Sequence, residues 1–390
     1  MDLLLEILII LLVAKTFGEL VEHFGYPSII GELIGGLIVG NTFLQVLSVS
    51  HELERFSYIG ILFLMFFAGA ETNVKDLMKA GKTSFLVALA GISLPFTLAV
   101  ALGMAFDYAL YTSLFLGTIL AATSVGITVR VLIDLGRLRS KVGMTIISAA
   151  VIDDVLAVFI LTMITGLSTT GEIVVLEIVK VLAFIALFFL ISLYVIFPLI
   201  KKALSYTNKI KTESGLESIV IIFILFYAMF AEEMYIAGIT GCFLAGLLIS
   251  QTEEKNFLVT NTKTIGYGFF IPVFFTYIGV AADLKQIMYA GIVGLLLIIV
   301  AILGKVVGCY IMCKLSKFDN KDSLTVGIGM VPRMEVAIII ANIGLVQNII
   351  DQSLYSTIIL MAFVTTLITP PLLKVVLSEK KPVSAEASQV

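Results

Sequence analysis

The chain has 390 residues, of which 59% are hydrophobic and only 14% are charged, with a formal net charge of −3 and a mean hydropathy of +1.11. Because a soluble core cannot bury that much apolar surface, the composition predicts an all-α protein that crosses a lipid bilayer many times. It contains no basic stretch of the kind that binds nucleic acid, so we expect no nucleic-acid partner. No segment has the composition of a separate soluble domain, so we do not expect one either.

Residues 3–22 form the first predicted membrane helix. Asp2 and Glu6 stand where a secretory signal would carry basic residues, and no small-residue cleavage site follows. We therefore expect this helix to remain in the protein as its first span.

Further spans follow in chain order, and together they make thirteen predicted transmembrane helices. Each is a run of about 20 apolar residues, separated from the next by charged residues, glycine or proline. The predicted spans are 3–22, 27–45, 54–73, 82–106, 109–133, 140–166, 172–200, 214–232, 235–250, 262–282, 286–313, 322–347 and 353–377.

The basic residues predict the orientation of these spans. If the N-terminus lies outside, eighteen of the 25 Lys and Arg residues fall on the inner side and only Arg55 and Lys285 fall in outer loops. Cytoplasmic loops of membrane proteins carry such an excess. We therefore expect a multi-pass protein of the cell membrane with a cytoplasmic C-terminus, and a disordered polar tail at 378–390.

An odd number of spans allows two inverted six-helix repeats, one on each side of the seventh span. Such repeats are marked by interrupted helices at matching positions, and spans 109–133 and 322–347 both qualify. The first contains Ala122–Thr128 and the second contains Gly327–Arg333, with Pro332 removing a backbone donor. Broken backbone at membrane depth must be packed in protein or line a wet cavity, so we expect the two breaks to cross. The alternative is that these small residues merely allow close helix packing.

Span 140–166 carries Asp153 and Asp154 near its centre. A carboxylate at that depth costs several kcal/mol, which makes an accidental pair implausible. Adjacent residues on a helix point about 100° apart, so one carboxylate can face an ion cavity while the other faces a neighbouring helix. Burial disfavours the ionised carboxylate and a nearby ammonium favours it, so such a pair can alternate between a proton and a small cation.

Of the other charged residues inside spans, three bear on the site. We expect Lys305 to pair with one of the aspartates when neither proton nor cation is bound, because a buried lysine changes its charge readily. Snorkelling of Lys305 to the membrane surface is the alternative. Arg333 and Glu335 follow the Pro332 break, and we predict that they neutralise helix ends or contact neighbouring helices, with direct ion binding as the other option.

Two other groups of polar residues are less informative. Glu71, near the inner end of span 54–73, is a secondary candidate for the site. Cys242, Cys309 and Cys313 lie in apolar runs without His or Cys partners nearby, so we expect packed or lipid-facing thiols rather than a disulfide or a metal site.

Taken together, these residues resemble the Na⁺/H⁺ antiporters of the cation:proton antiporter-2 family, most closely the NapA type, over essentially the whole chain. Val125 is a departure, because many members of the family have proline at that point of the broken helix. The matching segments in chain order are Pro27–Gly36, Phe67–Thr72, Ala122–Ser124, Asp153–Asp154, Lys305 and Gly329–Glu335.

The resemblance implies roles for individual residues. Asp154 would carry the cation and the protons, and Asp153 would pair with Lys305. Thr123 and Ser124 would line the cavity, so that the oxygen ligands of a transported Na⁺ or Li⁺ would come from these two residues and the two aspartates. The double aspartate is similar to that of the electrogenic members, and the resemblance implies no cofactor.

The resemblance also implies a homodimer and an elevator-like movement of one domain against another. The dimer domain would comprise residues 1–81 and 214–285, and the core transport domain would comprise residues 82–170 and 286–377. Residues 171–213 would link them, and 378–390 would form the tail.

Other activities remain open. K⁺/H⁺ exchange is the nearest, although relatives with that activity carry a nucleotide-binding C-terminal domain for which the tail leaves no room. A Na⁺-coupled solute symporter could share the architecture. An intramembrane aspartyl protease also needs two membrane aspartates, but on two helices; adjacent residues of one helix cannot converge, so we do not expect an enzyme.

Overall fold

The computed structural model describes residues 3–170, 175–204, 215–282 and 287–377, and every regular element in these ranges is a helix. Eight helical stretches are long and apolar enough to cross a membrane, and three shorter helices are also apolar. The prediction of an all-α, multi-pass membrane protein is therefore confirmed. The predicted disordered tail at 378–390 lies outside the described residues.

The helices follow one another with short connections. The first seven are α1 (Leu3–His23), α2 (Ser28–Val39), α3 (His51–Glu71), α4 (Val74–Ala105), α5 (Leu110–Ala121), α6 (Val125–Asp134) and α7 (Lys141–Thr170). A long segment follows, made of α8 (Val175–Ile191), η1 (Ser192–Ile196) and α9 (Phe197–Leu204). The remaining elements are α10 (Gly215–Glu233), α11 (Gly238–Ile249), α12 (Lys255–Ile265), η3 (Gly266–Phe270), α13 (Ile271–Ala281), α14 (Ile287–Leu315), α15 (Asn320–Gly329), α16 (Glu335–Val346) and α17 (Gln352–Leu377).

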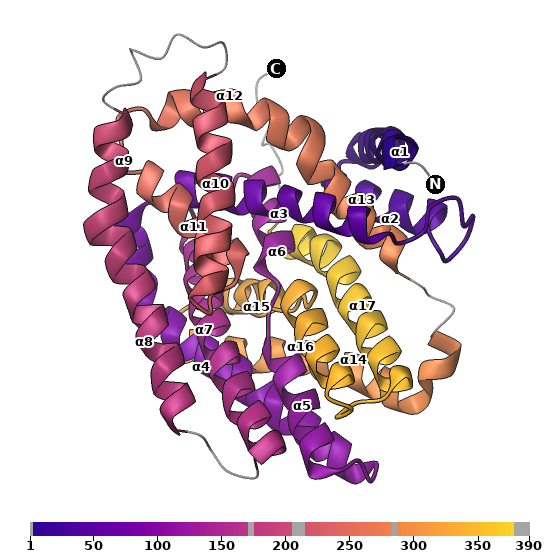
Figure 1. Cartoon of the computed structure of the whole chain (residues 1–390). Helices are drawn as coiled ribbons and strands as arrows, with labels where there is room; N and C mark the ends of the chain where they lie inside the picture. The colour runs from indigo at the N-terminus through magenta and orange to yellow at the C-terminus, as the bar shows by residue number, and fades with distance from the viewer. Residues whose placement is uncertain (1–2, 171–174, 205–214, 283–286, 378–390) are drawn as a thin grey trace, which may run out of the picture.

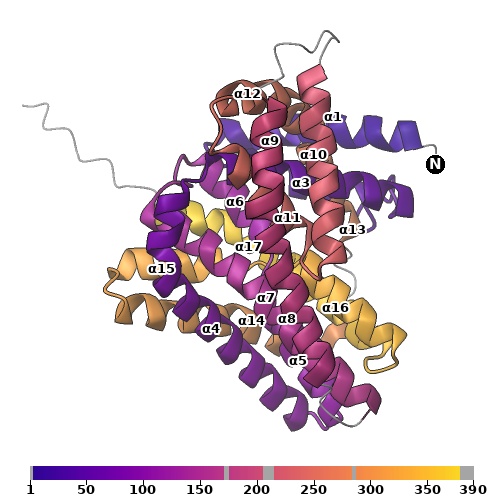
Figure 2. The ribbon, with the colours of Figure 1, turned by 60° about the vertical axis from the view of Figure 1, so that its left-hand side comes forward.

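The helices form two groups. Figure 1 shows α1, α2, α3, α12 and α13 in the upper part of the molecule and α4, α5, α14, α16 and α17 in the lower part. The turned view in Figure 2 keeps the same separation, with α8 and α9 running down the front of the molecule past both groups. We call α1–α3 with α10–α13 the α3 group, and α4–α7 with α14–α17 the α4 group.

Glycines hold the α3 group together at very short range. A Cβ added at Gly36 of α2 would lie 2.0 Å from the carbonyl oxygen of Thr276 in α13. A Cβ added at Gly69 of α3 would lie 2.0 Å from the carbonyl oxygen of Phe243 in α11. Only glycine permits these approaches, so the helices of this group touch backbone to backbone.

The α4 group is closed in the same way. A Cβ at Gly304 of α14 would lie 2.9 Å from the Cα of Pro95 in α4, and a Cβ at Gly308 would lie 2.6 Å from the carbonyl oxygen of Ala90. Across the described residues, each glycine whose added Cβ would come within 3.0 Å of another helix's backbone joins two helices of one group. The two groups are therefore each tightly packed, and the border between them is made by side chains.

Two of the predicted spans are interrupted where the sequence indicated. Span 109–133 is divided into α5 and α6 by residues 122–124, and span 322–347 is divided into α15 and α16 by residues 330–334. Val125 begins α6, so the first break forms without a proline at that position. Each break leaves two half-helix ends inside the protein.

The three cysteines are buried, and none of them forms a disulfide. Cys309 of α14 lies 3.8 Å from the carbonyl oxygen of Val87 in α4. Of the two expected environments, packed and lipid-facing, the structure has the packed one.

Candidate functional site

Asp153 and Asp154 lie in the middle of α7 and face different helices. Asp153 is fully buried, and its Oδ1 lies 2.9 Å from Lys305 Nζ of α14. Asp154 is partly buried and accepts a hydrogen bond from the Thr240 hydroxyl of α11. Because adjacent helical residues project about 100° apart, α7 directs one carboxylate into the α4 group and the other to the border with the α3 group.

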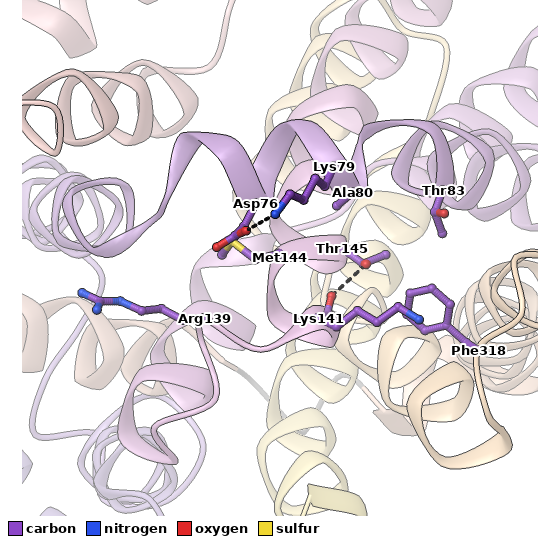
Figure 3. A pocket seen from close by; sticks show the side chains of 9 residues that line it. All are labelled: Asp76, Lys79, Ala80, Thr83, Arg139, Lys141, Met144, Thr145 and Phe318. Carbon is purple, nitrogen blue, oxygen red and sulfur yellow. Dashed lines mark hydrogen bonds and ion pairs between the residues drawn. The ribbon is translucent and has the colours of Figure 1, made fainter.

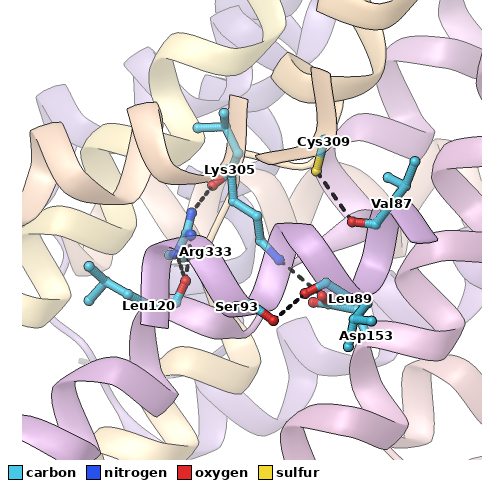
Figure 4. Close-up of polar contacts among 9 residues, drawn as sticks. Val87, Leu89, Ser93, Leu120, Asp153, Lys305, Cys309 and Arg333 are labelled. Carbon is cyan, nitrogen blue, oxygen red and sulfur yellow. Dashed lines mark hydrogen bonds and ion pairs between the residues drawn. The ribbon is translucent and has the colours of Figure 1, made fainter. Parts of the chain in front are cut away.

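Lys305 does not extend toward the membrane surface. Its side chain is 0% exposed, like that of Asp153, and Figure 4 shows its ammonium group directed at the Asp153 carboxylate. Removing two charges from water is costly, and a direct contact with a hydrogen bond offsets that cost only when both partners are in place. Loss of either residue would therefore leave the other as an unpaired buried charge.

The close contact of α4 and α14 places Lys305 at this point. A Cβ at Gly91 of α4 would lie 2.8 Å from Cys309 Sγ and 3.6 Å from Lys305 Nζ. The preceding residue of α14, Gly304, packs against Pro95. Small residues on both helices thus open the space through which the lysine side chain reaches α7.

The two breaks cross and bind each other. The backbone N–H of Ser124 donates to the carbonyl oxygen of Pro332 at 2.8 Å. The Thr128 hydroxyl, in the first turn of α6, donates to the carbonyl oxygen of Gly329 at the end of α15 at 2.7 Å. Backbone groups that helix breakage frees are thereby satisfied inside the membrane, as hydrocarbon requires.

Arg333 neutralises the carbonyl end of α5. Its Nε donates to the carbonyl oxygen of Leu120 at 2.9 Å, and a second guanidinium nitrogen, Nη2, donates to the same atom. Its Nη1 donates to the carbonyl oxygen of Val331 at 2.7 Å, and the side chain is 0% exposed. A cation at the negative end of a half-helix is electrostatically favourable, so Arg333 stabilises the crossing rather than offering a ligand to a cation.

Two buried oxygens of this region have no hydrogen-bond partner among the described residues. They are Thr123 Oγ1 and Asp153 Oδ2, on residues that are 3% and 0% exposed. Buried polar atoms are almost always satisfied, so each such atom calls for an explanation. In secondary transporters, coupling ions bind beside broken helices near the middle of the membrane, which is where these two oxygens lie. Ser124 is also buried, at 3% exposed.

A small cavity follows the border between the two groups. Its volume is ≈ 230 Å³, and its walls are apolar except for Ser148 and Thr240. The lining residues are Leu77, Met78, Gly81, Ser148, Val151, Ile152, Phe189, Thr240, Phe243, Leu244 and Leu247. Since Thr240 also donates to Asp154, the cavity reaches the direct partner of that carboxylate.

This arrangement agrees with the comparison with known proteins. A family model described as "Sodium/hydrogen exchanger, transmembrane" matches residues 8–379. The chain belongs to this sodium/hydrogen exchanger family. The resemblance to cation:proton antiporters is therefore confirmed.

Several characterised exchangers are similar over nearly their whole length. The Na(+)/H(+)-K(+) antiporter GerN of Bacillus cereus is 36% identical over 370 residues, which is 95% of each chain. The Na(+)/H(+) antiporter of Enterococcus hirae is 36% identical over 94% of this chain and 96% of its own. The solved structure of the sodium proton antiporter MjNhaP1 of Methanocaldococcus jannaschii covers 96% of each chain with a TM-score of 0.72 and 19% identity, which shows a shared fold.

The remaining site candidates of this exchanger lie elsewhere. Glu71 Oε1 lies 2.6 Å from Lys263 Nζ of α12, so Glu71 contacts a lysine of its own group rather than either aspartate. Arg139, between α6 and α7, donates from Nε to the Glu71 carbonyl oxygen at 2.8 Å. Glu335 begins α16, and its side chain lies outside the described part of the structure.

A larger polar cavity of ≈ 400 Å³, drawn in Figure 3, lies away from the aspartates. Lys79 pairs with Asp76 at 3.4 Å on its wall, and Lys141 Nζ lies 3.6 Å from the centre of the Phe318 ring. None of the predicted site residues lines this cavity, so we assign it no part in the exchanger's ion site.

Sequence reasoning missed Thr240. It is the one hydroxyl residue of α11, and that isolation inside an apolar helix was the available signal. Its partner could not be read from the sequence, because Thr240 and Asp154 lie 86 residues apart.

Proposed function

We propose that this protein exchanges Na⁺ or Li⁺ for protons by competition of the two species for the Asp154 carboxylate, with Asp153 as the second carboxylate. The observation that carries the proposal is the division of labour in α7: Asp153 is closed off by Lys305, whereas Asp154 faces the border between the helix groups. A site that must open alternately to the two sides of the membrane has to lie at such a border.

Lys305 supplies the means of coupling. In the empty state its ammonium group balances the Asp153 charge. When a cation enters, that carboxylate can turn from the lysine to the cation, and when protons enter, the carboxylates lose their charge. Thr123 and Ser124 are the further oxygen donors, and Thr123 Oγ1 is free of other hydrogen bonds among the described residues. Because two carboxylates take part, we infer electrogenic exchange.

The packing supports an elevator movement of two rigid units. The α3 group lies within a dimer domain of residues 1–81 and 214–285. The α4 group, apart from Val74–Gly81 at the start of α4, lies within a core transport domain of residues 82–170 and 286–377. The segment 171–213 would link them. The close glycine contacts lie within each unit, whereas side-chain contacts cross the border. One unit can therefore slide along the other with few backbone clashes.

The finer architecture belongs to the same proposal. Thirteen spans in two inverted repeats would place α5–α6 and α15–α16 at matching positions, and the crossing of their breaks supports this symmetry. We place the N-terminus outside and the C-terminus in the cytoplasm, with two copies paired through the dimer domain. The exposed row Leu4, Leu8 and Leu12 of α1 is the surface we assign to that pairing.

K⁺/H⁺ exchange is the second candidate. It is favoured by one observation, the name of the Bacillus cereus relative GerN, which includes K(+). Na⁺-coupled solute symport of the same fold would need an organic substrate for proton or sodium release. Comparing Na⁺, Li⁺ and K⁺ in one assay separates all three activities.

The test uses purified protein in liposomes with a pH-sensitive dye inside. We expect Na⁺ or Li⁺ added alone to drive proton flux, and Asp154→Asn to abolish it. Asp153→Asn should severely impair exchange or change the reversal potential, which reports the charge moved per cycle. Sodium-driven proton flux that survives unchanged in Asp154→Asn would defeat the assignment, and flux only with K⁺ would select the second candidate.

A further inference from the structure

A second cluster of charged side chains lies at the border, apart from the aspartate pair. Arg130 of α6 is 7% exposed and Glu32 of α2 is 3% exposed. Ionised groups inside membrane helices are expensive and mark functional sites by default. Neither residue has a part in the ion exchange proposed above, and they belong to different helix groups.

Arg130 joins three elements through one guanidinium group. Its Nε pairs with Asp134 Oδ2 of its own helix at 3.0 Å. Its Nη2 donates to Ser28 Oγ at the start of α2 at 3.1 Å, and the guanidinium carbon lies 4.8 Å from the centre of the Tyr267 ring in η3. Two of the three contacts therefore reach from the α4 group to the α3 group.

Glu32 provides a buried carboxyl group on the α3 side. It lies about one turn after Ser28 on α2, so the two side chains share a face of that helix. Its Oε2 has no hydrogen-bond donor, and Arg130 Nη1 has no acceptor, within the described residues. Buried polar atoms are almost always satisfied, so this cluster has groups left for contacts that the present conformation does not make.

The α3 side of the cluster is rigid. A Cβ at Gly31, the neighbour of Glu32, would lie 2.1 Å from the carbonyl oxygen of Phe17 in α1, so α2 is fixed against α1 by backbone contact. On the other face of α2, Gly36 is fixed against α13. Relative movement at this cluster must therefore come from α6 and the group to which it belongs.

We propose that Arg130 and Glu32 are positioning residues for transport: the contacts of Arg130 with Ser28 and Tyr267, beside the buried carboxyl group of Glu32, set the position of the core transport domain against the dimer domain. This inference rests on the proposed function, because it needs a domain that moves during exchange. The pair does not bind the cargo. As α6 moves past α2, these contacts break and form again. Their strength in each conformation determines how the protein is distributed between the two end positions of the core transport domain.

The first test measures sodium-driven proton flux for Arg130→Gln, Glu32→Gln and the double variant in proteoliposomes. Arg130→Gln should lower the maximal rate by about tenfold, the effect of losing one charge-assisted hydrogen bond, and Glu32→Gln should lower it by less, both with the half-saturating Na⁺ concentration unchanged. The double variant should be no slower than the slower single variant, because the two residues act on one contact. Multiplying effects, or a changed half-saturation with an unchanged rate, would overturn the proposal.

Lys141→Gln is the matched control for charge. It removes a cation of the α4 group whose ring contact, with Phe318, stays within that group, so its rate should equal that of the wild type. Arg130→Lys keeps the charge without the planar guanidinium fork and should recover part of the rate. A rate for Arg130→Lys equal to that of Arg130→Gln would show that charge across the border is not what matters, against the proposal.

The second test reports position directly and does not need transport. Spin labels on cysteines at Phe85 of α4 and Phe257 of α12 occupy sites that are 49% and 54% exposed, while the three native cysteines are buried. Arg130→Gln should redistribute the distances between the labels. If that variant is too unstable to purify, Ser28→Ala, which removes the acceptor of one Arg130 hydrogen bond and leaves the Tyr267 contact, should shift them in the same direction by less. Identical distributions in all variants would contradict the inference.

The two proposals fail in different ways. A wild-type protein without sodium-driven proton flux would refute the proposed function. Wild-type exchange with unaltered rates and distances in the Arg130 and Glu32 variants would refute the positioning role alone.

Discussion

Asp153 with Lys305 and Arg130 with Glu32 are two sets of buried ionisable side chains in membrane helices, but only the first is a direct ion pair. Asp153 and Lys305 are both 0% exposed, lie 2.9 Å apart and belong to one helix group. Arg130 and Glu32 belong to two groups, and each keeps an atom without a partner among the described residues. An ion pair whose two residues belong to one rigid unit can adjust the charge of an ion site. Side chains that face each other across a border can instead favour one relative position of the two units.

The packing around each pair explains the contrast. Lys305 is held where Gly304 and Pro95 bring α14 and α4 into contact. Arg130 instead contacts Ser28 and Tyr267 by side chain only. Backbone contact fixes a distance because nothing in it can rotate, while side-chain contacts can be remade at modest cost. Substitutions at buried and at partly exposed contacts test this explanation.

The largest expected effect is that of Lys305→Ala. Leaving Asp153 buried without its cation should destabilise the folded protein by about 3–5 kcal/mol unless the carboxylate takes up a proton, which would shift the pH profile of exchange. Melting temperature in detergent and exchange rate against pH measure the two effects. A variant with the melting temperature and the pH profile of the wild type would show that the Asp153–Lys305 pair neither stabilises the fold nor affects exchange.

A smaller effect is expected at the border. Thr240→Val keeps the shape of the side chain and removes the hydroxyl that donates to Asp154. The loss of one hydrogen bond to a carboxylate should change the exchange rate by about tenfold while the melting temperature stays close to that of the wild type.

Thr365→Val is the control for this substitution. The Thr365 hydroxyl donates to Met361 of its own helix at 2.9 Å, so its removal should leave exchange unchanged. Equal rates for Thr240→Val and the wild type would remove Thr240 from the ion site and weaken the assignment of Asp154 to the border.

The smallest effect is expected for Lys263→Gln. Its partner Glu71 lies in the same group, but their side chains are 38% and 22% exposed. Ion pairs that water reaches contribute about 0–1 kcal/mol, so melting temperature and exchange rate should both stay near the wild-type values. A loss as large as that of Lys305→Ala would mean that burial does not distinguish the pairs, and Glu71 would return as a site candidate.

Much of the site was predictable because membrane depth makes charge conspicuous. Asp153, Asp154 and Lys305 stood out as ionisable residues in apolar runs, and the expected contact of Lys305 with an aspartate is present in the structure. The residues alone left open which aspartate it would contact, since that depends on the rotation of α7 relative to α14; the family resemblance implied Asp153, which is the partner in the structure. Thr240 and Glu32 were not assigned roles, because a hydroxyl or carboxylate is informative only when its neighbour is known.

The sequence by itself determined the class of protein, the location of the broken helices and the carboxylate pair. Hydrocarbon leaves each backbone group to be satisfied locally, so apolar runs must be helical and their interruptions stand out without knowledge of the rest of the chain. Only the tertiary structure decided that Asp153 faces Lys305, that Asp154 faces Thr240 and that Arg130 reaches α2. Those contacts join residues 86–152 positions apart, and their geometry comes from how closely glycines let particular helices approach.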